Sequence, residues 1–155
     1  MKRRILLLAA GAAPLAALAH HGWSSFDQEK PVYLQGRIKS VRWANPHAEV
    51  VLVVDGGLAL PADLARRSLP AQSQQVDGAA VLARTRLPEA AEGEWTVEFA
   101  PLFRMQAWGV REPKVGDRIE VIGYIAPRIG SGRLLRVEYL FVDGKAYGLR
   151  SSPAG

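Results

Sequence analysis

The fold is decided by the stretch WTVEFAPLFRMQAWG, which covers residues 95–109. Residues 95–99 alternate apolar and polar side chains, which is the pattern of a half-buried β-strand. In residues 101–108 a proline opens a segment whose apolar side chains recur at helical spacing, and a glycine follows it. The stretch therefore predicts a strand that leads directly into a short helix.

Further strand patterns lie on both sides of this stretch. Their side chains alternate or form β-branched runs, and Asp143-Gly144 is a hairpin signal. The predicted strands cover residues 32–43, 48–54, 95–99, 118–125 and 134–142, with a sixth short strand at 146–150. The element order is then β-β-β-α-β-β, with one late return strand.

A helix between the third and fourth strands is the arrangement of the OB-fold, a five-stranded Greek-key barrel. We therefore predict a mainly β protein with a small OB-fold-like antiparallel barrel. The alternative is a generic small antiparallel barrel or sandwich. Two details are expected inside the strands. Gly36 predicts a bulge or bend, and Val137, Tyr139 and Phe141 are expected on one face of their strand.

The chain is expected to form one domain, at residues 32–150. Residues 20–31 lack periodicity and are predicted to form an N-terminal arm, which Trp23 and Phe26 could attach to the body. Residues 57–94 differ in composition and are predicted to be an insertion between the second and third strands. Residues 151–155 are expected to be a tail.

Residues 1–19 have the three parts of a secretory signal peptide. Lys2, Arg3 and Arg4 form a basic n-region, a short apolar segment follows, and Ala17-Leu-Ala19 is a small-x-small cleavage site. Cleavage would deliver the chain to the periplasm, by the general secretory route rather than the twin-arginine route that an Arg-Arg pair also fits. The alternative is an uncleaved anchor, although a membrane span needs about 20 apolar residues.

Charge and cysteine content exclude several classes of function. Removing the signal takes three of the 20 Lys and Arg and none of the 15 Asp and Glu, so the formal charge falls from +5 to +2. That charge is too mild for a nucleic-acid-binding protein. The absence of cysteine excludes disulfides, thiolate metal ligands and a cysteine nucleophile. No phosphate loop, dinucleotide fingerprint or nucleophile elbow is present.

The three histidines are the candidate metal ligands, namely His20, His21 and His47. Cleavage after Ala19 would leave a free α-amino group on His20, which can chelate a metal together with the His20 imidazole. The His47 imidazole, from the turn Asn-Pro-His, would add a third nitrogen and resemble the histidine brace of copper proteins. Alternatively, the amine and the amide and imidazole nitrogens of His21 bind Cu(II) in a plane. Cu(II) favours such nitrogen ligands, while imidazole also suits zinc and nickel.

The alternative for these histidines is structural. The His-His pair could be only a solvated end of the mature chain, and His47 could hydrogen-bond within its turn. A structural metal site normally has four ligands, so the histidines alone are a weak signal.

The chain has four tryptophans, and three of them are candidate ligand-binding residues: Trp23, Trp43 and Trp108. Exposed aromatic rings on the rim of a barrel can stack on a sugar or a planar ligand. The alternative is that they are core and anchor residues, which is the commoner use of tryptophan.

Three segments together resemble a known family. They are HHGWSSFD at residues 20–27, GRIKSVRWANPH at 36–47 and MQAWG at 105–109. They are similar to the small exported bacterial proteins of domain of unknown function 6152. The resemblance covers most of the mature chain except residues 57–94. It implies export, a small β-rich fold and a shared site at His20, His21 and His47, and it implies no activity.

The sequence is therefore interpreted as an exported periplasmic binding protein that could hold a transition metal, with copper favoured. A role in metal handling or as an accessory to a metalloenzyme is expected, rather than catalysis. The competing hypothesis is a non-metal OB-type module that binds a small molecule, a glycan or a protein partner through its aromatic rim. A third is a redox enzyme of the histidine-brace kind.

Overall fold

The computed structural model describes residues 22–155. The predicted signal peptide, and His20 and His21, lie outside the described residues. The six strands are β1 Val32–Arg42, β2 Glu49–Val54, β3 Gly93–Glu98, β4 Arg118–Ile125, β5 Leu134–Val142 and β6 Lys145–Gly148. The helices are α1 Gly78–Arg84 and α2 Leu102–Ala107, with 3-10 turns η1 Trp23–Ser25 and η2 Leu64–Arg66. Each predicted strand lies within two residues of its observed bounds.

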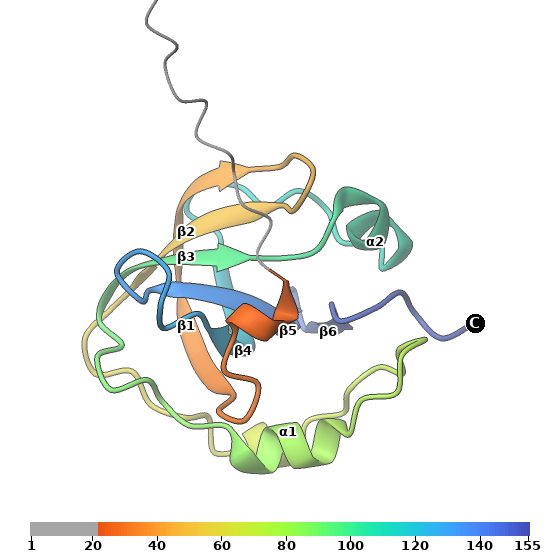
Figure 1. Cartoon of the computed structure of the whole chain (residues 1–155), viewed down its shortest axis with the longest axis horizontal. Coiled ribbons are helices and arrows are strands. Elements are labelled where there is room, and N and C mark those ends of the chain that lie inside the picture. Colours follow the sequence, from red (N-terminus) through yellow and green to blue (C-terminus); the bar gives the residue numbers. More distant parts are fainter. Residues whose placement is uncertain (1–21) are drawn as a thin grey trace, which may run out of the picture.

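The strands form one sheet in the order β3-β2-β1-β4-β5-β6, and β3 also pairs in parallel with β5. That additional pairing closes the first five strands into a barrel, while β6 extends the sheet beyond β5 (Figure 1). α2 connects β3 with β4. The predicted mainly β, OB-fold-like barrel is confirmed.

β1 is the longest strand of the barrel, with 11 residues, and its two halves pair with different neighbours. Its first half pairs with β4 and its second half with β2, and Arg37 has a partner on each side. Gly36 lies where these strands approach closely, since a Cβ atom there would stand 2.1 Å from the carbonyl oxygen of Val53. The bulge predicted at Gly36 occurs further along, between Ile38 and Ser40. Gly36 permits close contact instead.

The barrel interior is a continuous apolar core to which every one of the first five strands contributes. In β5, a β-bulge at Glu138 shifts the alternation by one residue. Val137 therefore faces the core, whereas Tyr139 and Phe141 pack on the outer face. The prediction that these three side chains share one face was wrong, because strict alternation contains no information about a bulge.

α2 packs against the barrel core through Met105, which is fully buried. Asn45 Oδ1, in the β1–β2 loop, accepts a hydrogen bond from the backbone nitrogen of Leu102 at the start of α2. The β1–β2 loop and α2 are therefore linked and lie at the same end of the barrel.

The insertion at residues 57–94 covers the outer face of β1, β4 and β5. Leu64 of η2 and Val81 and Leu82 of α1 pack there against a cluster that includes Tyr33 and Tyr139. Figure 1 shows α1 below the barrel, away from α2. The sequence analysis did not predict α1, which is only seven residues long and is capped by Asp77 accepting from Ala80 N.

The tail at residues 151–155 is joined to the insertion. Ser73 N donates to Ser152 O, Ala154 N donates to Ala71 O, and a bridge pairs Gln72 with Pro153. None of the helices in residues 22–155 is long and apolar enough to cross a membrane.

Candidate functional site

His47 lies at the end of the β1–β2 loop, beside the end of β3. Backbone hydrogen bonds from Ala48 N to Ala100 O and from Phe99 N to Ala48 O continue the β2–β3 pairing to this point. The His47 Nδ1 atom lies 3.5 Å from Glu98 Oε1, and the imidazole is 24% exposed. The paired backbone thus holds His47 at the surface with one ring nitrogen toward a buried carboxylate.

Glu98 is buried, and its charge is balanced by Arg136. Arg136 Nε donates to Glu98 Oε1 at 2.7 Å, and neither side chain is more than 8% exposed. In the parallel pairing of β3 with β5, Glu98 stands opposite Arg136, so the strand register fixes this contact. The arginine compensates a carboxylate in a place where an unpaired charge would be strongly disfavoured.

A second ion pair lies near the first and joins a fully buried Glu138 to a half-buried Arg150. Arg150 donates to Glu138 Oε2 through Nε at 2.8 Å and through Nη2 at 2.6 Å. Its Nη1 donates to Gln28 Oε1 of the arm at 2.8 Å. The buried charge network consists of these two ion pairs, and its formal charges cancel: Glu98, Arg136, Glu138 and Arg150.

The arm places aromatic rings on this network. The Trp23 ring centre lies 3.7 Å from Arg150 Cζ and 5.1 Å from Arg136 Cζ. The Phe26 ring centre lies 4.3 Å from Arg136 Cζ, and Trp23 also meets the Tyr124 ring edge to face. Each contact between a guanidinium group and a ring is worth roughly 0.5–2 kcal/mol. The expectation that Trp23 and Phe26 attach the arm to the body is confirmed.

The chain matches a known family model over residues 7–59, with the description family of unknown function (DUF6152). Over that range, the chain resembles DUF6152. The predicted resemblance is confirmed there, and the range contains all three histidines, whereas residues 105–109 lie beyond it. No curated protein and no solved structure matches the chain significantly. Because DUF6152 has no known function, the match assigns no role to any residue.

Of the three predicted metal ligands within the DUF6152 range, His47 is the one that the structure describes. Among residues 22–155, no three His, Cys, Asp or Glu side chains lie together in a group that could hold a metal ion. His47 and Glu98 form a pair. A complete site would need ligands from residues before Gly22.

The three candidate tryptophans lie in two places. Trp43 and Trp108 are half-buried against the barrel core, and Trp108 Nε1 donates to Ser151 O at 2.8 Å. Trp23 belongs to a separate cluster with Phe26 and Tyr124. The structure therefore places Trp23 with the buried charge network and the other two with the core.

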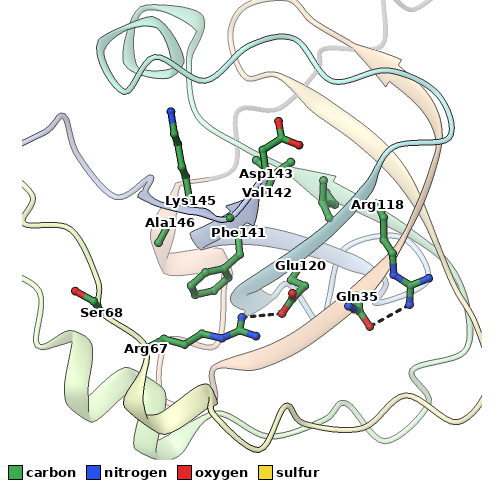
Figure 2. A pocket seen from close by; sticks show the side chains of 12 residues that line it. Gln35, Arg67, Ser68, Arg118, Glu120, Phe141, Val142, Asp143, Lys145 and Ala146 are labelled. Atoms are coloured by element: carbon green, nitrogen blue, oxygen red, sulfur yellow. Dashed lines mark hydrogen bonds and ion pairs between the residues drawn. The ribbon is translucent and has the colours of Figure 1, made fainter.

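A groove with a volume of about 530 Å³ lies on the outer face of β1, β4 and β5, next to β6 and the insertion. Figure 2 shows Arg67 and Glu120 paired on one side of it and Gln35 beside Arg118 on the other. Arg67 also lies over the Phe141 ring, at 4.8 Å from its centre. The most buried cation of this groove is thus already neutralised by a carboxylate.

Sequence reasoning missed the buried charge network, although part of it has a recognisable signal. Arg136 and Glu138 stand two apart inside the otherwise apolar strand LLRVEYLFV. Charged residues are almost never fully buried unless they are paired, so two opposite charges in such a strand indicate partners. Glu98 has no such signal, because its partner depends on the pairing of β3 with β5.

Proposed function

We propose that this chain is exported to the periplasm and binds a transition metal there, with copper favoured, through His20, His21 and His47. The proposal places cleavage after Ala19, which frees the α-amino group of His20. Its support comes from the surroundings of His47 and from the path of the arm.

The path of the arm is the observation that carries the proposal. Trp23 stacks on Arg136, and Arg136 pairs with Glu98. The same Glu98 oxygen that accepts from Arg136 lies 3.5 Å from the His47 ring. The arm is thus anchored two side chains away from His47, and its last described residue is Gly22. Two extended residues span up to about 7 Å, and the proposal requires this span to bring His20 and His21 to the same ion as His47.

Glu98 has the position of a supporting residue for a metal-bound histidine. Histidines that bind metals usually donate their other ring N–H to a carboxylate or carbonyl group, which fixes the tautomer and the ring orientation. With Nδ1 toward Glu98, His47 would bind the metal through Nε2. The separation of 3.5 Å is longer than a normal hydrogen bond, and we expect it to shorten when a metal fixes the ring.

Copper is favoured by the chemistry of the ligands. An amine and two or three imidazoles form an all-nitrogen set, which suits Cu(II) in tetragonal geometry. Copper binding releases protons from these groups, so the affinity should fall at acidic pH. Such a site fits metal handling, or delivery of metal to a partner enzyme.

The test is a Cu(II) titration, by calorimetry and electron paramagnetic resonance, of protein that begins at His20. We expect one ion bound per chain, with nitrogen hyperfine structure. His47→Ala should weaken binding at least tenfold, which corresponds to about 1.4 kcal/mol. Gln106→Ala, at an exposed position of α2, serves as the matched control and should bind like the parent. Unchanged affinity in His47→Ala would remove His47 from the site.

The groove of Figure 2 favours the second candidate function, a module that binds a small molecule or glycan without a metal. Arg118 and Lys145 line it without a carboxylate partner among the described residues, and Phe141 offers an aromatic surface. A ligand that binds equally well before and after removal of metal by a chelator would favour this function.

A further inference from the structure

A second large groove, about 560 Å³ in volume, lies where the arm, the segment after α1 and the β4–β5 loop meet. We call it the Trp95 groove. The side chains of Pro31, Val32 and Trp95 line it and are themselves buried, and Leu87 and Ile125 are half-buried. Pockets of 300–1,000 Å³ with a mostly apolar lining are the usual form of small-molecule sites.

Arg86 is held rigidly at one side of this groove. Its backbone nitrogen donates to Pro31 O at 3.1 Å, and its carbonyl accepts from Tyr33 N at 2.9 Å. The guanidinium Nη1 donates to the carbonyl oxygens of Ala83 and Thr85, at 3.1 and 2.8 Å. The Arg86 side chain is thus fixed by neutral carbonyl groups rather than by a carboxylate.

Arg133 has an equivalent position on the β4–β5 loop. Its Nη1 donates to Glu92 O at 2.8 Å, and its Cζ atom lies 5.2 Å from the centre of the Trp95 ring. The Trp95 ring is itself fixed, because Nε1 donates to Ala91 O at 2.7 Å. A second cation without a carboxylate partner among the described residues is therefore held beside a fixed aromatic ring.

The remaining charges around the groove largely cancel. Lys30 pairs with Asp27 at 3.4 Å, and Arg84 pairs with Glu29 at 3.6 Å. Apart from these two pairs and the two arginines, one more charged side chain lines the groove, Glu89. Four cations and three carboxylates leave a formal charge of +1, which a single negative charge on a ligand would neutralise.

We propose that the Trp95 groove binds a small amphipathic monoanion: an organic acid with an aliphatic or aromatic body. The body lies on Pro31, Val32 and Trp95, and the acid group lies between Arg86 and Arg133. Charge-assisted hydrogen bonds from guanidinium groups are the strong contacts for such a group. Binding of the anion in the Trp95 groove is independent of the proposed metal site, because none of these groove residues belongs to the buried charge network.

A pair of dyes with one aromatic body tests this proposal on the whole protein. 8-Anilino-1-naphthalenesulfonate carries one negative charge, and N-phenyl-1-naphthylamine is its neutral counterpart. We expect the charged dye to bind at one per chain, with a blue shift of its emission. The double variant Arg86→Gln/Arg133→Gln should bind the charged dye at least tenfold more weakly and the neutral dye within twofold of the parent.

Two controls keep the test specific. Arg37→Gln removes the same charge from an exposed position of β1 that lines neither groove, and it should leave the affinity for the charged dye unchanged. The charge-retaining variant Arg86→Lys/Arg133→Lys should keep most of the affinity, which separates charge from a fold defect. Equal loss in Arg37→Gln, or no loss in the double glutamine variant, would overturn the proposal. Binding of neither dye to the parent would do the same.

Discussion

At the scale of single residues, the buried charge network is the feature that most shapes the candidate site. Glu98 connects β3 to β5 through Arg136 and at the same time faces His47. Trp23 lies on Arg136 from the other side. One carboxylate therefore contributes to barrel closure, to anchoring of the arm and to the orientation of the one described histidine.

Glu98→Gln tests the structural part of this role. The substitution leaves the Arg136 charge buried without its counterion, and breaking a buried ion pair by removing one partner costs about 3 kcal/mol or more. We expect the free energy of unfolding, measured by urea denaturation, to fall by about that amount. Glu94→Gln is the control, since Glu94 also pairs with a cation, Lys39, but both side chains are more than half exposed. Equal small losses in the two variants would contradict the importance of Glu98.

At the scale of single residues, the sequence predicts local turns but does not predict contacts between distant residues. The Asn-Pro-His stretch predicts a turn between two strands, and the chain bends there at Asn45 and Pro46, because local residue types determine such breaks. The partner of His47 was not predicted, because Glu98 is 51 positions away along the chain and only strand pairing brings the two together.

At the scale of elements, β1 is the longest strand of the barrel and joins β2 to β4. Its alternating pattern was readable in the sequence, as were the patterns of the other strands and of α2. Two features of the fold could not be predicted from the sequence patterns. The bulge in β5 redirected Tyr139 outward, and α1 has too short a run of apolar residues to show helical periodicity.

Gly36→Ala tests the close approach of β1 to β2. The added Cβ would stand 2.1 Å from the backbone oxygen of Val53, which cannot move without separating the strands. Overpacking of this kind typically costs 1–3 kcal/mol, and we expect the upper end, about 3 kcal/mol. Gly22→Ala is the control, because its Cβ would meet only Ser24 Oγ, at 3.7 Å. Thermal melting compares the two, and a Gly36→Ala protein as stable as the parent would contradict this packing.

At the scale of the whole molecule, three tyrosines couple stability to alkaline pH. Burial raises the pKa of Tyr33, Tyr124 and Tyr139 above the ordinary value of 10, to about 12 for Tyr139. Above pH 10 the unfolded chain loses phenolic protons that the folded chain keeps, so the unfolded state binds fewer protons. The free energy of unfolding must then fall as pH rises from about 10 to 12.

Urea denaturation at a series of pH values measures this effect, with tyrosinate absorbance recorded on the same samples. We expect the urea midpoint to fall above pH 10 and most of the tyrosinate signal to appear together with unfolding. Tyr139→Phe should reduce the slope. A midpoint that stays constant up to pH 12 would show that these hydroxyl groups titrate freely in the folded protein.

The proposed metal site depends on cleavage of the signal peptide after Ala19, because only that cleavage would free the α-amino group of His20. The sequence and the family resemblance indicate the three histidines as candidate metal ligands. The structure adds two observations about their surroundings, namely the anchored arm and the position of Glu98 beside His47. The other proposed ligands, His20 and His21, precede the residues that the structure describes.

The most direct test of this site is a Cu(II) titration of protein that begins at His20, beside the same protein with its α-amino group acetylated. Acetylation converts the His20 amine into an amide, supplies no new amine, and changes nothing in residues 22–155. The proposed site predicts that the acetylated protein binds Cu(II) at least tenfold more weakly. Equal affinity of the two proteins would contradict a site built on the His20 amine.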